Sequence, residues 1–376
     1  MSIFSWILTL SIVAGQLIRL PFGPGSMNLL DLFIIGFLVF HLLKFRFKLK
    51  KPPVCIKGAM FFVLIAILSL IFSPLKLTLP QILISFSYTL RFLFYIVFAW
   101  IISPNFHTLK LAGVSLAILG LLQLIFFPDL SFLSILGWDP HYFRIVSTFL
   151  DPNFAGAFFV LTLLLLSRNF AKEKLNFWWF LLVYAALLLT FSRSSYIMFF
   201  VSFTILAIFL KSWRLQIITI GLFALLLLGF FIYAQTISLP RNINRTESAA
   251  FRINTWTQGW QLFEKHPILG VGFNAYRYAI RDYKLADLQF LKGHGSNSND
   301  SSLLSVAATT GLLGLFAFGY FLFSLIKTNY PQNRKLILPA LAGLLFHSLF
   351  ANSLFFPPIL LWLILTASSD KIHSTS

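Results

Sequence analysis

Long runs of apolar residues are the feature that most constrains how this chain can fold. With their flanks, several runs approach the roughly 20 residues that a helix needs to span a bilayer. They are Phe61 to Phe72, Leu111 to Phe127, Phe158 to Leu166, Tyr196 to Leu210 and Ile217 to Tyr233. Only 11% of the residues are charged, and the mean hydropathy of +0.86 lies outside the range of soluble domains. The sequence therefore predicts an all-α polytopic membrane protein, with residues 1–376 forming a single integral membrane domain.

The apolar runs and their flanks predict twelve transmembrane helices. Their approximate bounds are 3–20, 28–44, 55–73, 81–102, 111–127, 153–167, 176–192, 195–210, 215–235, 301–326, 336–353 and 357–369. If the N-terminus is cytoplasmic, four basic connections all fall on the cytoplasmic side, as the positive-inside rule requires. We therefore expect a protein of the cytoplasmic (inner) membrane with both termini in the cytoplasm.

The segment 236–300 is predicted to be a large extracytoplasmic loop. It carries more basic than acidic residues, although the positive-inside rule places cations on the other face. Such an excess favours binding of an anion, and a solvated loop without a ligand is the alternative. The net charge of +18 does not predict a nucleic-acid partner, because the other basic residues lie in short loops beside membrane lipids.

Within this loop, the sequence "FRINTWTQGWQLFEKHP" has the spacing of a helix, because Arg252, Trp256 and Trp260 are four residues apart. Its tryptophans are expected to rest on the outer leaflet. The His-Pro pair at 266–267 should end the helix, since a residue before proline avoids the helical conformation. The glycines of 270–272 then predict a turn back toward the membrane.

Arg91 and His347 are titratable side chains that lie within predicted spans. Arg91 lies in the middle of the fourth span, where an unpaired cation would cost at least about 2.5 to 3.5 kcal/mol. Ser87, Tyr88 and Tyr95 lie on the same helical face and would direct it into the bundle. Two roles stay open for Arg91: it binds an anionic group of a substrate, or it ties helices together. His347 is expected to make interhelical hydrogen bonds.

Polar clusters also lie where predicted spans meet the extracytoplasmic face. "RIVSTFLDPNFAG", residues 144–156, places Asp-Pro-Asn at the start of the sixth span, where capping and a direct role in chemistry are both open. "TFSRSS", residues 190–195, joins two spans by a tight turn. Arg193 of this turn is either held rigidly at the outer interface or reaches toward lipid headgroups.

The stretch "GHGSNSNDSS", residues 293–302, precedes the tenth span. Asn299, Asp300 and Ser301 suit the N-cap of that helix, and a helix N-terminus favours phosphate oxygens. His294 is a candidate base and equally a candidate bystander. We expect neither a metal nor another cofactor, since the carboxylates of the external segments are few and scattered.

Taken in order, these motifs resemble the bacterial O-antigen ligase and O-antigen polymerase family. The motifs run over residues 147–314 and are "STFLDPNFAG", "TFSRSS", "RINTW…GW…LFEKHPILGVGFNAY" and "NDSSLLSVAATTGLLGL". The resemblance implies a fold like that of the C-type glycosyltransferases and a glycan donor linked to undecaprenyl diphosphate. A ligase moves this glycan to a glycan or lipid acceptor, whereas a polymerase joins it to another lipid-linked repeat. A chain-length regulator is then a further candidate partner.

The resemblance also implies roles for individual residues. Arg193 and Arg252 match the arginines that contact the donor diphosphate, where fixed guanidinium groups stabilise the departing charge without a metal. Arg91 and Arg144 are further candidate cations for the diphosphate. Acceptor binding or structural support is the expected role of Asn153, Asn299 and Ser301.

One position departs from the family pattern. Ligases usually carry His-Asn eleven residues before the first glycine of the GLLG-like motif, and the histidine is their proposed base. Counting back eleven residues from Gly311 gives Asp300, which Ser301 follows. A carboxylate can serve as base when its pKa is suitable. The base is therefore expected to be Asp300 or, after a loop rearrangement, His294.

The sequence thus predicts an inverting, metal-independent membrane glycosyltransferase of the O-antigen ligase or polymerase type. It would polymerise or ligate a polyprenyl-diphosphate-linked oligosaccharide at the external face. The alternative is a secondary transporter of a small anion, for which Arg91 is the obvious candidate in the middle of the membrane.

Overall fold

The structure is a computed structural model in which helices account for almost all regular structure. It describes residues 3–22, 25–45, 51–102, 106–136, 138–168, 174–238, 245–287, 290–291, 296, 298–327 and 331–368. The α-helices are α1 (Ile3–Ala14), α2 (Leu29–Phe45), α3 (Val54–Ile71), α4 (Leu79–Ile101), α5 (Phe106–Phe126), α6 (Pro152–Ser167), α7 (Lys174–Leu189), α8 (Arg193–Phe209), α9 (Trp213–Tyr233), α10 (Arg245–Lys265), α11 (Tyr276–Asp282), α13 (Ser302–Ile326), α14 (Pro331–His347) and α15 (Pro357–Ser368). Short 3₁₀ helices cover Ser131–Leu136, Ser147–Phe149 and Ser353–Phe355, and a π-helix covers Ala234–Ser238.

A helix lies at each segment predicted to span the membrane. Among the described residues, five helices are long and apolar enough to cross a bilayer: α3, α4, α5, α13 and α9 with its π-helical extension. Five further apolar helices, α1, α6, α7, α8 and α15, are shorter. The prediction of an all-α integral membrane protein is confirmed at this level.

The first predicted span, 3–20, is too long. α1 ends at Ala14, and the chain continues into a two-stranded antiparallel hairpin, β1 (Arg19–Phe22) and β2 (Gly25–Asn28), with Arg19 opposite Asn28. Gly15 breaks the helix with a φ of +56°, and a Cβ there would lie 2.5 Å from the carbonyl oxygen of Thr148. The apolar sequence continues past Ala14, but this close approach of a distant segment stops the helix.

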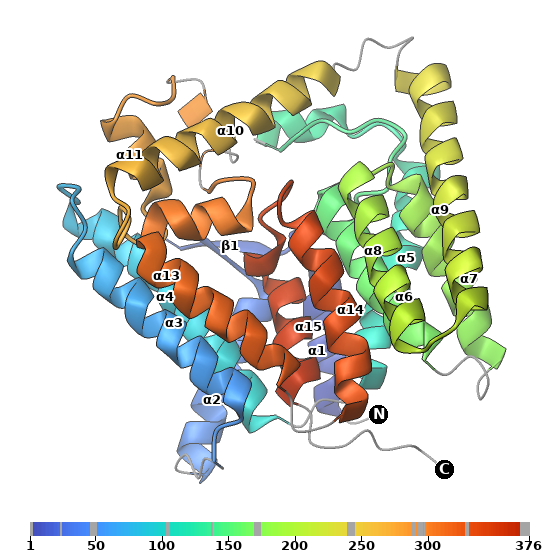
Figure 1. The fold of residues 1–376 in the computed structure, drawn as a ribbon, viewed down its shortest axis with the longest axis horizontal. Coiled ribbons are helices and arrows are strands. Elements are labelled where there is room, and N and C mark those ends of the chain that lie inside the picture. The colour runs from blue at the N-terminus through green and yellow to red at the C-terminus, as the bar shows by residue number, and fades with distance from the viewer. Residues whose placement is uncertain are drawn as a thin grey trace.

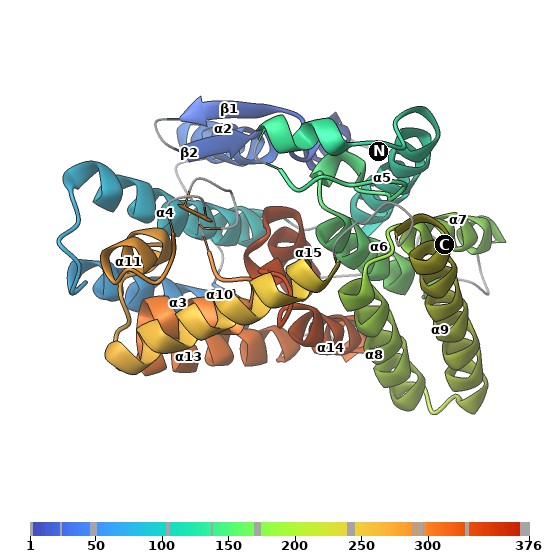
Figure 2. The ribbon, with the colours of Figure 1, turned by 90° about the horizontal axis from the view of Figure 1, so that it is seen from above.

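The central helices are buried on all sides and the outer ones on one side only. Nearly every described residue of α6 and α15 is buried, whereas most of α9 is exposed. Figure 2 shows α15 in the centre and α9 at the edge. Small residues allow close crossings: Gly58 of α3 faces Ser324 of α13, and Gly343 of α14 faces Ser202 of α8. Such contacts are typical of helix packing in membranes.

α13 is interrupted in its middle, at Gly311, where φ is 63° and ψ is −161°. The segment 267–272 fits into this break and satisfies the backbone groups that the break releases. The amide of Leu312 donates to Pro267 O (2.7 Å), and the amides of Val271 and Gly272 donate to the carbonyls of Ala308 and Thr309 (both 3.0 Å). The motifs "HPILGVG" and "TTGLLG" therefore form one interlocked unit.

Two glycines make this interlock sterically possible. A Cβ on Gly270 would lie 2.3 Å from the carbonyl carbon of Thr309, and one on Gly311 would lie 2.3 Å from that of Ile268. Both glycines also have positive φ. The turn predicted at 270–272 is confirmed, and its partner proves to be α13.

α10 and α11 lie across one end of the helical bundle, and the first residues of α1 and the last of α15 lie toward the other end (Figure 1). α10 ends at Lys265, which confirms the stop predicted from the His-Pro pair. Thr255, Gln258 and Leu262 on its inner face are buried, and α10 packs on α13. Trp260 is 52% exposed. Contact of the tryptophans with the outer leaflet stays a prediction.

Candidate functional site

The polar motifs that are distant in sequence meet at the end of the bundle that carries α10. Asp151 caps α6, because one of its carboxylate oxygens accepts hydrogen bonds from the amides of Asn153 (2.6 Å) and Phe154 (3.1 Å). Burial raises the pKa of Asp151, and these two amides oppose the shift. The cap thus fixes Asn153 on the first turn of α6.

Asn153 connects the ends of α6 and α8. Its Oδ1 accepts hydrogen bonds from the hydroxyls of Ser192 (2.8 Å) and Ser194 (3.3 Å), and its carbonyl accepts one from Ser195 (3.1 Å). The Ser195 hydroxyl also lies 3.4 Å from Nε2 of His347 on α14, as expected for an interhelical contact of that histidine. Three helix ends are therefore linked by side chains, and Asn153 provides structural support.

The start of α13 is fixed by Ser301 and Asn299. The Ser301 hydroxyl caps the helix by accepting from the amide of Leu304 (3.4 Å). The Asn299 side chain is fully buried; its Oδ1 accepts from the Ser301 amide (2.9 Å), while its Nδ2 donates to the Tyr276 hydroxyl (3.2 Å) and to the Thr255 carbonyl. Asn299 thereby attaches α13 to α10 and α11, which is also a supporting role.

Backbone contacts join α13 to the end of α14. The amide of Ser302 donates to the carbonyl of Ser348 (2.9 Å), and the Ser302 hydroxyl accepts from the amide of Leu354 (3.2 Å). Asp300 lies between Asn299 and Ser301, and both of these neighbours are held by hydrogen bonds. The backbone of Asp300 is therefore fixed on both sides.

Asp300 is half-buried between α13 and α10. Its Oδ2 accepts a hydrogen bond from the Thr255 hydroxyl (3.3 Å). Burial raises the pKa of Asp300 to about 6, against the smaller opposing effects of Arg252 and the Thr255 hydroxyl, while Asp151 and Asp139 raise it further. A carboxyl group with this pKa is ionised for most of the time at neutral pH and is a far better proton acceptor than an ordinary aspartate.

Arg252 lies one helical turn before Thr255 on the inner side of α10. Its charge acts on Asp300, yet within the part of the chain that the structure describes no hydrogen bond or ion pair reaches its guanidinium. A half-buried arginine of this kind favours an anionic ligand. Arg252 and Asp300 thus place a cation and a carboxyl group within one small region.

Arg193 and Arg144 lie at the turn between α7 and α8. Arg193 begins α8, is exposed, and places its guanidinium carbon 5.7 Å from the centre of the Phe230 ring. Arg144 donates from Nε to the carbonyl of Thr190 (2.9 Å) and from Nη2 to that of Phe191 (3.2 Å). Arg144 therefore holds the turn that presents Arg193.

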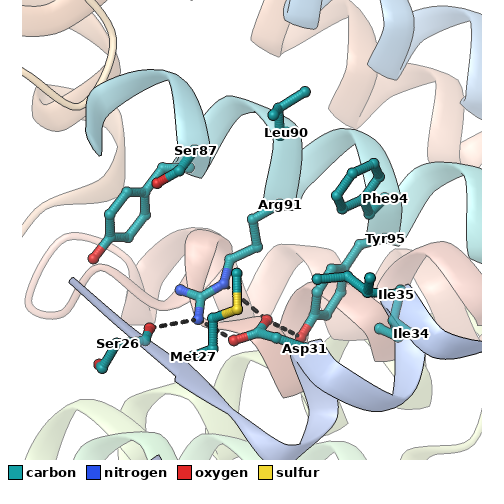
Figure 3. Close-up of a pocket in the computed structure, with 11 residues that line it drawn as sticks. Ser26, Met27, Asp31, Ile34, Ile35, Ser87, Leu90, Arg91, Phe94 and Tyr95 are labelled. Atoms are coloured by element: carbon teal, nitrogen blue, oxygen red, sulfur yellow. Dashed lines mark hydrogen bonds and ion pairs between the residues drawn. The ribbon is translucent and has the colours of Figure 1, made fainter. Parts of the chain in front are cut away.

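Arg91 of α4 is paired with a carboxylate of another helix. It forms an ion pair with Asp31 of α2, with Nε 2.8 Å from Oδ1 (Figure 3). The Tyr95 hydroxyl donates to the same carboxylate (2.9 Å). The structure thus shows the helix-tying role among the two that the sequence left open. The pairing role of Asp31 was not predicted from the sequence, although "NLLD" fits the start of a helix. The side chains of Asn28 and Asp31 each accept a hydrogen bond from the other residue's backbone amide.

His294 lies outside the described residues. Sequence reasoning missed Thr255 and Tyr276, and the helical spacing from Arg252 to Thr255 was the signal that could have found the first. Among the described residues, no group of three or more His, Cys, Asp or Glu side chains is placed to hold a metal ion.

Part of the chain is similar to a known protein family. No curated protein matches the chain. A family model described as O-antigen ligase matches residues 175–319, from the start of α7 through most of α13. This segment contains Arg193, Arg252 and Asp300, and it contains the interlocked motifs described above. The resemblance to this family is therefore confirmed over this segment, and the chain is an integral membrane protein whose residues 175–319 match the O-antigen ligase family.

Proposed function

We propose that this protein is a glycosyltransferase of the inner membrane that polymerises or ligates a polyprenyl-diphosphate-linked oligosaccharide. The reaction would take place at the extracytoplasmic face, which we assign to the end of the bundle that carries α10 and α11. The observation that carries the proposal is the juxtaposition of Asp300, a carboxylate with a raised pKa, and Arg252, a half-buried cation that forms no ion pair with any described side chain. Both belong to the segment that matches the O-antigen ligase family.

Asp300 acts as the general base in this proposal. An acceptor hydroxyl attacks the anomeric carbon of the donor sugar while Asp300 takes the hydroxyl proton. The new glycosidic bond forms as the bond from the anomeric carbon to the diphosphate oxygen breaks, so the configuration at that carbon inverts. With a pKa of about 6, the carboxylate is about nine-tenths ionised at pH 7. Thr255 orients it through the hydrogen bond to Oδ2.

Arg252 and Arg193 bind the donor diphosphate. The departing polyprenyl diphosphate gains one negative charge as the bond breaks, and a guanidinium group pairs with two phosphate oxygens at once. Fixed cations in a partly desolvated site stabilise that charge in the transition state without a metal ion. Arg144 supports Arg193 by holding the turn between α7 and α8.

The proposed topology has twelve spans with both termini in the cytoplasm. The shorter helices, such as α1 and α15, would span with the help of their flanking turns, and the segment 236–300 would be the periplasmic loop. Thiol labelling tests this directly: a cysteine at the exposed position Thr257 should react with a membrane-impermeant reagent in intact cells. Labelling only after lysis would refute the assignment of the face.

The function is tested by reconstitution of the purified protein with undecaprenyl-diphosphate oligosaccharide, with and without a chelator. A ladder of lipid-linked repeats identifies a polymerase, and transfer to a separate acceptor identifies a ligase. We expect product in either form and no effect of the chelator. Absence of product with competent donor and acceptor would overturn the proposal.

A further inference from the structure

A second feature of the molecule lies beside the β1–β2 hairpin and is not lined by Asp300. Two adjoining cavities of about 210 and 190 Å³ share Ser26, Tyr88 and Arg91 as lining residues. The first lies between α2 and α4 (Figure 3), and the second continues toward Gln16 and Trp138. Together they form one space with two chemically different ends.

The cavity between α2 and α4 is apolar and electrically neutral. Ile34, Ile35 and Phe94 are among the apolar side chains that line it. The two charged groups at its inner end, Arg91 and Asp31, neutralise each other as an ion pair. Such a space suits a hydrocarbon chain, and α2 and α4 also carry side chains on their outer faces that would face lipid.

The adjoining cavity has a positive charge, on Arg19, that no side chain described by the structure balances. Arg19 donates from Nε to the Ser26 hydroxyl (3.1 Å), and its guanidinium carbon lies 5.1 Å from the centre of the Trp138 ring. Among the described residues, no acidic side chain lies within ion-pair distance of Arg19. Burial lowers the pKa of this guanidinium, and the charge of Arg91 adds a smaller effect in the same direction. Gln16 and Asn28 contribute amide groups to the same wall.

We propose that this combined cavity binds an anionic lipid, with its phosphate group beside Arg19 and an acyl chain between α2 and α4. A phosphate supplies the charge that Arg19 lacks and accepts hydrogen bonds from the surrounding donors. An apolar cavity with a few convergent polar groups is the usual form of a small-molecule site. Asp300 and Arg252 do not line this cavity, although Phe154 beside Asn153 does, and the proposal does not depend on the proposed glycosyl transfer.

The test is binding of phosphatidic acid to the purified full-length protein in phosphatidylcholine nanodiscs, in the absence of any glycan. Wild-type protein is expected to retain phosphatidic acid in preference to diacylglycerol of the same chains. Arg19→Gln should weaken this binding about tenfold, the loss expected for one charge-assisted hydrogen bond. Arg281→Gln removes an equal charge at an exposed position and should leave binding unchanged.

Two further measurements distinguish binding of a lipid from binding of a soluble phosphate, and distinguish loss of binding from loss of the folded state. Glycerol 3-phosphate should displace the lipid only weakly, and Leu90→Trp, which fills the apolar end, should lower lipid binding at an unchanged melting temperature. Arg19→Lys should retain part of the affinity. Equal binding by Arg19→Gln and wild type, equal binding of diacylglycerol, or displacement by equimolar glycerol 3-phosphate would each overturn the proposal.

Discussion

Two arginine–aspartate pairs in this molecule have the same chemical groups and different arrangements. Arg91 contacts Asp31 directly, and the Tyr95 hydroxyl satisfies the same carboxylate. Arg252 affects Asp300 through its charge, but no hydrogen bond or ion pair joins the two side chains. The only hydrogen bond to the Asp300 carboxylate among the described residues comes from a neutral hydroxyl.

The difference separates a structural pair from a reactive one. A buried carboxylate without a direct cationic partner costs stability, and such a cost is typical of sites that bind or transform a ligand. A pair that is fully satisfied within the protein has no capacity left for a substrate. The position of each arginine relative to its carboxylate thus indicates which of the two regions carries chemistry.

The largest effect is expected from Asp300→Asn, which tests the reactive pair. The amide has nearly the same shape but cannot take the acceptor proton, so the rate of transfer should fall by about 10² to 10⁴. The initial rate with a lipid-linked oligosaccharide measures this. Asp282→Asn, at an exposed site paired with Arg281, is the matched control and should keep the wild-type rate. A near-normal rate for Asp300→Asn would remove this residue from the mechanism.

Asp31→Asn tests the structural pair and should act on stability. It leaves the Arg91 guanidinium in the bundle without a counter-charge, which is expected to cost about 3 to 5 kcal/mol. Thermal unfolding of the purified protein measures the loss. The double substitution Asp31→Leu with Arg91→Met should be less destabilised than Asp31→Asn, because no charge remains. If Asp31→Asn melted like wild type, the pair would not be the structural one.

Arg252→Gln should reduce transfer by about 10² to 10³, the usual effect of removing one group that stabilises a developing anion. Its melting temperature should stay near that of wild type, since no partner in the described structure is lost. Arg252→Lys is expected to fall in between, because an ammonium group cannot pair with two phosphate oxygens in parallel. An unfolded Arg252→Gln variant with normal kinetics in its folded fraction would contradict the comparison.

The smallest effect is the pH dependence that Asp300 gives to transfer and to stability. Below pH 6 the transfer rate should fall up to tenfold per unit, because Asp300 becomes protonated. The pKa of Asp300 in the folded protein lies above its usual value of 3.8, so folding favours the protonated carboxyl group. The contribution to stability is therefore present below about pH 4 and is lost as the pH rises through about 6. Asp300→Asn should abolish this change in melting temperature, and an unchanged profile would contradict the assignment.

The sequence alone was sufficient to predict structural features that depend only on residues close to one another along the chain. The apolar runs predicted the helices, the His-Pro pair predicted the end of α10 at Lys265, and the caps at Asp151 and Ser301 follow from residue type. The loss of helix at Gly15 and the hairpin after it could not be predicted, because a carbonyl from Thr148 enforces them. The break at Gly311 likewise depends on the segment 267–272.

The sequence by itself determined that the chain is a helical membrane protein, since no soluble core could bury so much apolar surface. It also determined which polar residues are candidates for chemistry. Only the tertiary structure decided which arginines are already satisfied, because Arg91 meets a carboxylate 60 residues away whereas Arg252 meets none among the described residues. Pairing of charges depends on distances of a few ångströms between helices, and periodicity along one helix does not contain that information.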